Sequence, residues 1–129
     1  MVNGAGALIE DASNDGIIVS GGAGTITDAG TIGSVRCQPG VYAIAFSGSF
    51  ADRVILDPGV VLDGKVVGGT GTNTLELAAA PGSTGTVSAF GTEFQGFGTI
   101  TLDKGASWLL DGAAPADKPF PSRGVTCCR

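Results

Sequence analysis

A glycine-rich stretch in the middle of the chain is the first candidate for chemistry. Residues 68–75 read G-G-T-G-T-N-T-L, close to the nonapeptide G-G-x-G-x-D-x-U-x that binds calcium in stacked β-turns. Asn73 stands where the pattern has its Asp ligand. A calcium ion in such a site takes carboxylates from two successive copies, and this chain has one copy without the carboxylate. We therefore predict no metal site, and expect the glycines to form a corner that Asn73 caps or joins to a side-chain ladder.

Four aspartates are candidate acids: Asp57, Asp63, Asp103 and Asp111. If Leu56 and Leu102 are equivalent positions, Asp57 and Asp103 lie two coils apart, or about 10 Å at ~4.8 Å per coil. That spacing falls near the wide end of the geometry of inverting glycosidases. However, Asp57 and Asp103 each precede a Pro-Gly or Lys-Gly corner, where Asp commonly forms an Asx-turn, and no His, Tyr or Arg cluster accompanies them. We assign no catalytic residue and predict that the chain is not an enzyme.

The remaining reactive or ring-bearing side chains point to no cofactor. The sequence has no His, which excludes Ser/His/Asp and Cys/His catalysis. Cys37, Cys127 and Cys128 are odd in number and lack the spacing of a zinc site, so we expect unpaired thiols. Trp108 and Tyr42 could stack on sugars, but Trp108 lies in an alternating stretch and is expected to be core or half-buried. No cofactor is expected.

Charge and hydropathy exclude two classes of partner. The formal net charge is −5 and the seven basic residues are scattered, which disfavours nucleic-acid binding. No apolar run approaches the ~20 residues of a membrane helix, so no membrane insertion by this chain is expected. The N-terminus lacks the basic start and apolar core of a signal peptide.

The elements that position these residues repeat along the chain. Leu56, Leu77 and Leu102 anchor similar phrases and are separated by 21 and 25 residues, a period typical of a solenoid. Alternation places Leu75 and Leu77 on the opposite face from Glu76. Turn residues separate the strands, including Asp28-Ala29-Gly30, Asp57-Pro58-Gly59, Asp63-Gly64, Pro81-Gly82, Lys104-Gly105 and Asp111-Gly112.

These patterns predict an all-β solenoid of about a dozen short strands with almost no helix. We expect inward positions to carry Ile, Leu, Val, Phe and Ala, and outward positions to carry Thr, Ser, Asp and Lys. Within the strand YAIAF we expect Ala43 and Ala45 opposite Ile44. The predicted organisation is a first, irregular coil over residues 1–23, repeats over 24–112, and an irregular tail with Pro and Cys over 113–129. Because each end of a solenoid presents an unpaired strand edge, we predict end-to-end self-association or marginal stability.

The repeats over about residues 24–112 resemble those in passenger regions of bacterial autotransporters and related large surface adhesins. The phrases that carry the resemblance are GTITDAGTI, LDPGVVLDGKVVGGTGTNTLELA and FGTEFQGFGTITLDKGASWLLDG. The resemblance implies a right-handed parallel β-helix, here of four to five coils with a period in the low twenties. It also implies a non-enzymatic fragment of a secreted or surface-displayed passenger, at the outer-membrane surface or outside the cell, with a host surface or a polysaccharide as its partner. Two alternatives stay open: a carbohydrate-active β-helix (hydrolase, lyase or sugar-binding module), and a truncated gene product without a function of its own.

Overall fold

The structure of the protein is a computed structural model. The structure describes residues 1–12, 14–34, 40–87 and 93–110. Within these residues it contains strands and no helix, as the sequence predicts. The predicted tail, 113–129, lies outside the described residues, and so does the end of the predicted repeat region.

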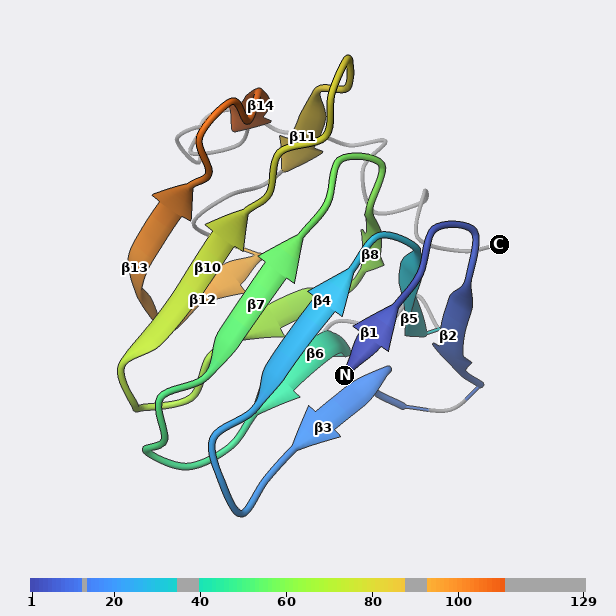
Figure 1. Cartoon of the computed structure of the whole chain (residues 1–129). Coiled ribbons are helices and arrows are strands. Elements are labelled where there is room, and N and C mark those ends of the chain that lie inside the picture. The colour runs from blue at the N-terminus through green and yellow to red at the C-terminus, as the bar shows by residue number, and fades with distance from the viewer. Residues whose placement is uncertain (13, 35–39, 88–92, 111–129) are drawn as a thin grey trace, which may run out of the picture.

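The described strands are short and follow one another at turns (Figure 1). They are β1 (Val2–Asn3), β2 (Leu8–Asp11), β3 (Ile17–Val19), β4 (Thr25–Asp28), β5 (Thr31–Ser34), β6 (Tyr42–Phe46), β7 (Arg53–Leu56), β8 (Val61–Asp63), β9 (Lys65–Val67), β10 (Asn73–Leu77), β11 (Gly85–Val87), β12 (Phe94–Gln95), β13 (Phe97–Leu102) and β14 (Trp108–Leu110).

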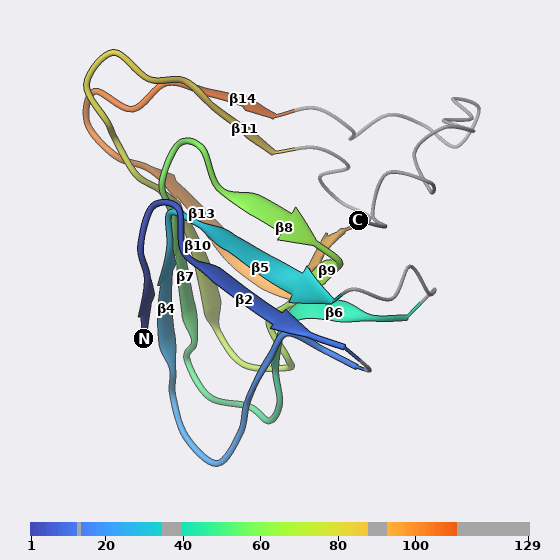
Figure 2. The same ribbon diagram turned by 90° about the vertical axis from the view of Figure 1, so that its right-hand side faces the viewer.

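The strands form a parallel β-helix of about four turns. The largest sheet has the order β1-β4-β7-β10-β13, and two others have the orders β3-β6-β9-β12 and β2-β5-β8. The fourth sheet pairs β11 with β14. All of these pairs are parallel, so each coil repeats the path of the one before it, and the sheets lie around a shared interior (Figure 2).

The register confirms the sequence period. Leu77 lies beside Leu56 on one side and beside Leu102 on the other, the two separations of 21 and 25 residues read from the sequence. The first coil follows the same path, because Val2 lies beside Thr27 and Leu8 beside Thr31. Residues 2–19 therefore supply three strands that pair with the second coil.

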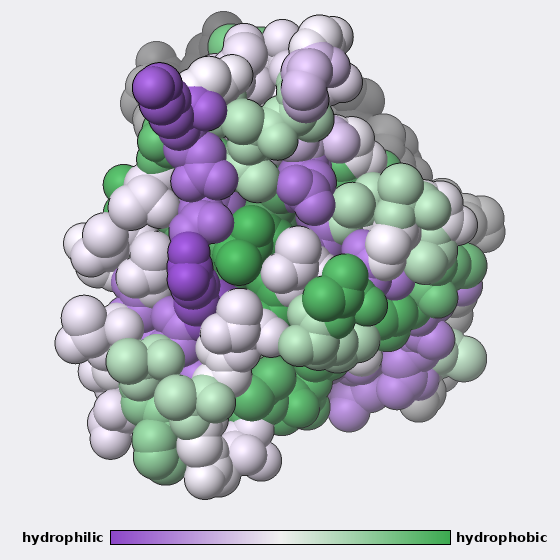
Figure 3. All heavy atoms as spheres, in the orientation of Figure 1, coloured by the Kyte–Doolittle hydropathy of each residue, from purple (hydrophilic) through white to green (hydrophobic). Residues whose placement is uncertain are grey.

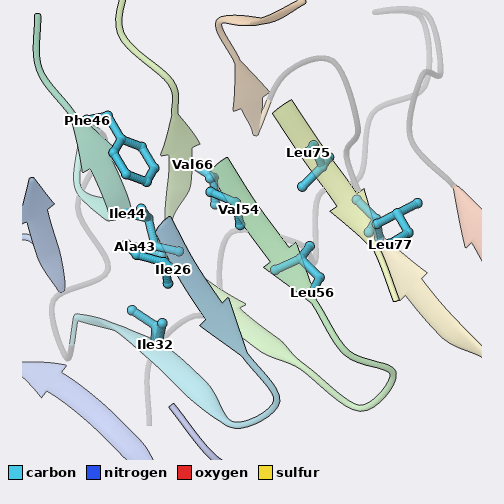
Figure 4. Packing of buried hydrophobic residues seen from close by; sticks show 11 residues of the cluster. Ile26, Ile32, Ala43, Ile44, Phe46, Val54, Leu56, Val66, Leu75 and Leu77 are labelled. Carbon is cyan, nitrogen blue, oxygen red and sulfur yellow. The ribbon is translucent and has the colours of Figure 1, made fainter. Parts of the chain in front are cut away.

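Aliphatic side chains fill the interior in rows that run from coil to coil. Ile26, Val54 and Leu75 form one such row in the largest sheet, and each is at most 1% exposed. Leu56 and Leu77 form the neighbouring row, and Ile44 and Val66 of another sheet lie toward Ile26 and Val54 in the same core cluster (Figure 4). Between Leu75 and Leu77 in β10, the side chain of Glu76 points outward, as alternation predicts. Burial of these rows is the main source of stability in a fold whose coils contact only their neighbours.

The corners are tight turns of the predicted composition. At Asp57-Pro58-Gly59-Val60 the Val60 amide donates to the Asp57 carbonyl at 3.2 Å, and Gly59 has a φ of 97°. Asp103-Lys104-Gly105-Ala106 repeats this arrangement at 2.9 Å, with a φ of 81° at Gly105. The third residue of such a turn needs a positive φ, which glycine adopts without steric cost.

Two expectations about which residues face inward were wrong. Aspartate was expected at outward positions, but Asp28 and Asp52 are 0% and 2% exposed. Ala43 was expected opposite Ile44, but both are buried, because the register between β6 and β9 shifts between Tyr42 and Ile44. A bulge of this kind interrupts the two-residue alternation.

Candidate functional site

The Gly68–Leu75 corner places the Asn73 side chain inside the solenoid. Asn73 is 0% exposed, and its Nδ2 donates to the carbonyls of Gly68, Gly71 and Gly96. Its Oδ1 accepts the backbone N–H of Asp52 at 3.0 Å. The amide thus satisfies backbone groups from three coils. The prediction that Asn73 caps the corner is confirmed.

This arrangement uses the side-chain amide as a donor where a metal site would need an acceptor. Three carbonyl oxygens surround Nδ2, and calcium would have to take the place of that nitrogen to reach them. Among the described residues, no group of three His, Cys, Asp or Glu side chains is arranged to hold a metal ion.

Asp52 plays the same role as Asn73 one coil earlier, and the sequence analysis did not identify it. Its Oδ1 accepts the Gly24 amide at 2.7 Å, just as Asn73 Oδ1 accepts the Asp52 amide. The repeat could have identified Asp52, because Leu56 and Leu77 are one coil of 21 residues apart, and the residue one coil before Asn73 is residue 52. We refer to Asp52 and Asn73 as the corner ladder.

A second polar pair lies at the other end of the β4 strand. Asn3 Nδ2 donates to Asp28 Oδ1 at 2.9 Å and to the Thr31 carbonyl at 3.1 Å, and the Gly30 amide also donates to Asp28 Oδ1. The other oxygen, Oδ2, is buried and has no hydrogen-bond partner. Burial raises the pKa of Asp28 above its ordinary value of 3.8, the bonds from Asn3 and Gly30 lower it, and the charge of Asp57 raises it further.

The candidate acids Asp57 and Asp103 occupy equivalent positions two coils apart, as predicted. The Asp57 amide donates to the Asp28 carbonyl, the Ala78 amide to that of Leu56, and the Asp103 amide to that of Leu77. Ala78 therefore lies between the two aspartates on this edge. Both are half-buried turn residues. Asp63 lies in β8 on a different sheet, and Asp111 lies outside the described residues.

Trp108 is a packing residue, as expected. It is half-buried against the core, and its Nε1 donates to the Ala78 carbonyl at 2.8 Å. The indole lies over Gly85, its partner in the parallel pair, where a Cβ would overlap the ring. Tyr42 is half-buried beside Lys65 on another sheet, so the two rings do not form one sugar platform. Cys37, Cys127 and Cys128 lie outside the described residues.

The outward face of the largest sheet is polar and mixed. Thr25, Arg53, Thr74 and Thr99 form one row across the strands, and Arg53 forms an ion pair with Glu76. Figure 3 shows a column of hydrophilic side chains on this face, with hydrophobic side chains beside it. No helix in the described part of the chain is long and apolar enough to cross a membrane.

Comparisons with known proteins add no relative. No protein-family model matches the sequence, and the searches of curated proteins and of solved structures give no match.

Proposed function

We propose that the chain is a non-enzymatic, adhesin-like segment of a secreted or surface-displayed protein, of the kind found in autotransporter passengers. The observation that carries this proposal is how the polar groups are used. Asn73 and Asp52 hold backbone amides of adjoining coils, while Asp57 and Asp103 begin turns. The side chains of Asn73 and Asp52 thus hold coils together, and the backbone carbonyls of Asp57 and Asp103 close turns, which are structural tasks.

The surface available to a partner is the broad outward face of the largest sheet. Rows of threonine flank the Arg53–Glu76 pair there. Threonine hydroxyls donate and accept hydrogen bonds, and a flat array of them suits a polysaccharide or a glycosylated host surface. Contacts repeated from coil to coil give avidity without a deep pocket.

Retention on immobilised polysaccharides tests this role. We expect binding to at least one member of a panel of neutral and acidic polysaccharides, with no release of reducing ends. Arg53→Glu should weaken retention because it places like charges beside each other in the centre of this face. Lys65→Glu, the matched charge reversal on another sheet, should not. Equal retention by both variants and the parent chain would refute this face as the binding surface.

A carbohydrate-active enzyme is the second candidate, favoured by the equivalent positions of Asp57 and Asp103. Two carboxylates on one edge, separated by two coil spacings of ~4.8 Å each, approach the separation used by inverting glycosidases. Reducing-end release that is abolished in both Asp57→Asn and Asp103→Asn would support this candidate and overturn the non-enzymatic proposal.

A further inference from the structure

The two ends of the solenoid differ in length and chemistry. At the N-terminal end of the largest sheet lies β1, with 2 residues. At the opposite edge lies β13, with 6 residues, and no described strand pairs with its outer side (Figure 1). A long unpaired edge strand is a template for another chain.

The last coil exposes side chains that earlier coils bury. Ile100 and Leu102 lie beside Leu75 and Leu77, which are 0% and 1% exposed, but they are themselves 44% and 58% exposed. Leu110, beside buried Val87, is 46% exposed. These three residues hold interior positions of a coil on which no described coil is stacked. We call them, together with the outer edge of β13, the terminal face.

We propose that the terminal face binds the terminal face of a second copy, through antiparallel pairing of the two β13 strands about a two-fold axis at Ile100. The backbone geometry defines the register. The Asp103 amide donates to the Leu77 carbonyl within the sheet, so by strand alternation Ile100 and Leu102 direct their N–H and C=O groups to the free edge. The register shift between β10 and β13 at Gly98 interrupts this alternation before Thr99. Pairing Ile100 with Ile100 of the second copy uses the outward N–H and C=O groups of both residues and keeps the apolar side chains on one side of the sheet.

Stacking the last coil on the first coil of another copy is a poorer match. Continuing the register of the largest sheet would place Leu102 against Asn3, whose amide already donates to Asp28 and Thr31. Only the 2 residues of β1 would meet the 6 of β13. The structure therefore narrows the end-to-end association expected from the sequence to one end, which gives a closed dimer instead of a filament.

The size of the terminal face predicts a weak dimer. The terminal face lies within the segment from Phe94 to Leu110, and even the 17 residues of that whole segment are fewer than the roughly 20–30 residues per side of a standard stable interface. We expect a dissociation constant of the dimer on the order of 10–100 µM, as for a weak, transient complex.

Light scattering coupled to size-exclusion chromatography tests the stoichiometry and the surface. We expect the mass to rise with concentration and to stop at the dimer. Leu102→Glu should keep the chain monomeric, whereas Leu8→Glu should not, although Leu8 at the other end is 56% exposed against 58% for Leu102. A monomer up to about 1 mM, growth beyond a dimer, or equal effects of the two variants would overturn the proposal. Circular dichroism checks that both variants keep the fold.

Crosslinking tests the register without relying on a charge substitution. In a background with Cys37, Cys127 and Cys128 changed to Ser, Thr99→Cys and Thr101→Cys are made as separate chains of different mass. The proposed pairing sets Thr99 opposite Thr101 of the second copy as a non-hydrogen-bonded pair, with a Cα separation of about 4.5 Å, compatible with a disulfide. Mild oxidation of the mixture should yield mainly the mixed dimer. Equal amounts of like and mixed dimers, or no dimer, would contradict the register.

Discussion

The backbone N–H of Asp52 donates to the Asn73 side-chain oxygen across 3.0 Å, from one coil to the next, in the buried interior. Asp52 repeats the relationship with Gly24 at 2.7 Å. Asn73 stands where the calcium-binding nonapeptide has its Asp ligand, but here its side chain forms hydrogen bonds from one coil to the next. It satisfies backbone groups that would otherwise be buried without partners.

Restoring the calcium consensus should damage the protein. In Asn73→Asp a carboxylate cannot donate to the carbonyls of Gly68, Gly71 and Gly96, so buried acceptors face a buried charge. We expect the free energy of unfolding in EDTA to fall by about 2–4 kcal/mol, measured by urea denaturation. The parent chain should have the same Tm in calcium and in EDTA.

Asn14→Asp is the control for this substitution, since Asn14 is exposed and the same chemical change there should alter stability by less than about 0.5 kcal/mol. An increase in the Tm of the parent chain on adding calcium would show that the corner binds metal after all.

Asp28 should make stability depend on pH. Its pKa is raised in the folded state, mainly by burial. A raised pKa means that the stabilisation from its proton is fully present below the unfolded value and is lost as pH rises through the folded value. The parent chain should therefore gain stability relative to Asp28→Asn as pH falls from neutral toward 4.

Urea denaturation of both chains at a series of pH values gives this difference, and the subtraction removes the contribution of the other carboxylates. A difference that is flat with pH, or that favours the parent chain more as pH rises, would be inconsistent with a buried carboxyl of raised pKa.

The contact between Gly85 and Trp108 should not tolerate a side chain. A Cβ at residue 85 would overlap the indole, so Gly85→Ala must displace the ring and weaken the hydrogen bond from Nε1 to Ala78. We expect a loss of about 1–3 kcal/mol and a red shift in the fluorescence of the single Trp. Gly98→Ala is the matched control, because a Cβ there meets nothing within 4 Å; an equal effect of the two substitutions would argue against the contact.

The ion pair between Arg53 and Glu76 should contribute little to stability. The side chains of Arg53 and Glu76 are 49% and 14% exposed, so solvent reaches the pair from the Arg53 side, and pairs screened by water and salt are worth about 0.2–1 kcal/mol. A double-mutant cycle with Arg53→Ala and Glu76→Ala should give a coupling energy in this range that declines in 0.5 M salt. A larger, salt-insensitive coupling would mean that the outward face is less solvated than its exposure indicates.

The sequence predicted those parts of the fold that depend on local chemistry and on the repeat. Pro-Gly and Lys-Gly corners determine their own turn geometry, and Leu56, Leu77 and Leu102 are large apolar residues whose spacing equals the length of a coil. Asn73 could be assigned to the corner because Gly68, Gly69 and Gly71 precede it in the sequence.

The inward aspartates could not be predicted from polarity alone. Asp52 accepts the backbone amide of Gly24, which lies 28 residues away in another coil. Asp28 accepts the Gly30 amide of its own turn and the side-chain amide of Asn3, which lies 25 residues away. The burial of Ala43 likewise depends on a bulge opposite β9, which alternation within β6 does not reveal. The adhesin-like role stays a prediction, since it depends on a partner.

The central claim is the register of the coils, because the corner ladder, the equivalence of Asp57 and Asp103 and the terminal face all depend on it. Scalar couplings across hydrogen bonds in NMR spectra identify which carbonyl each amide contacts. The fold predicts couplings from the Ala78 amide to the Leu56 carbonyl and from the Asp103 amide to the Leu77 carbonyl. Couplings from these amides to other carbonyls, or the reciprocal pattern of antiparallel hairpins, would contradict the β-helix described here.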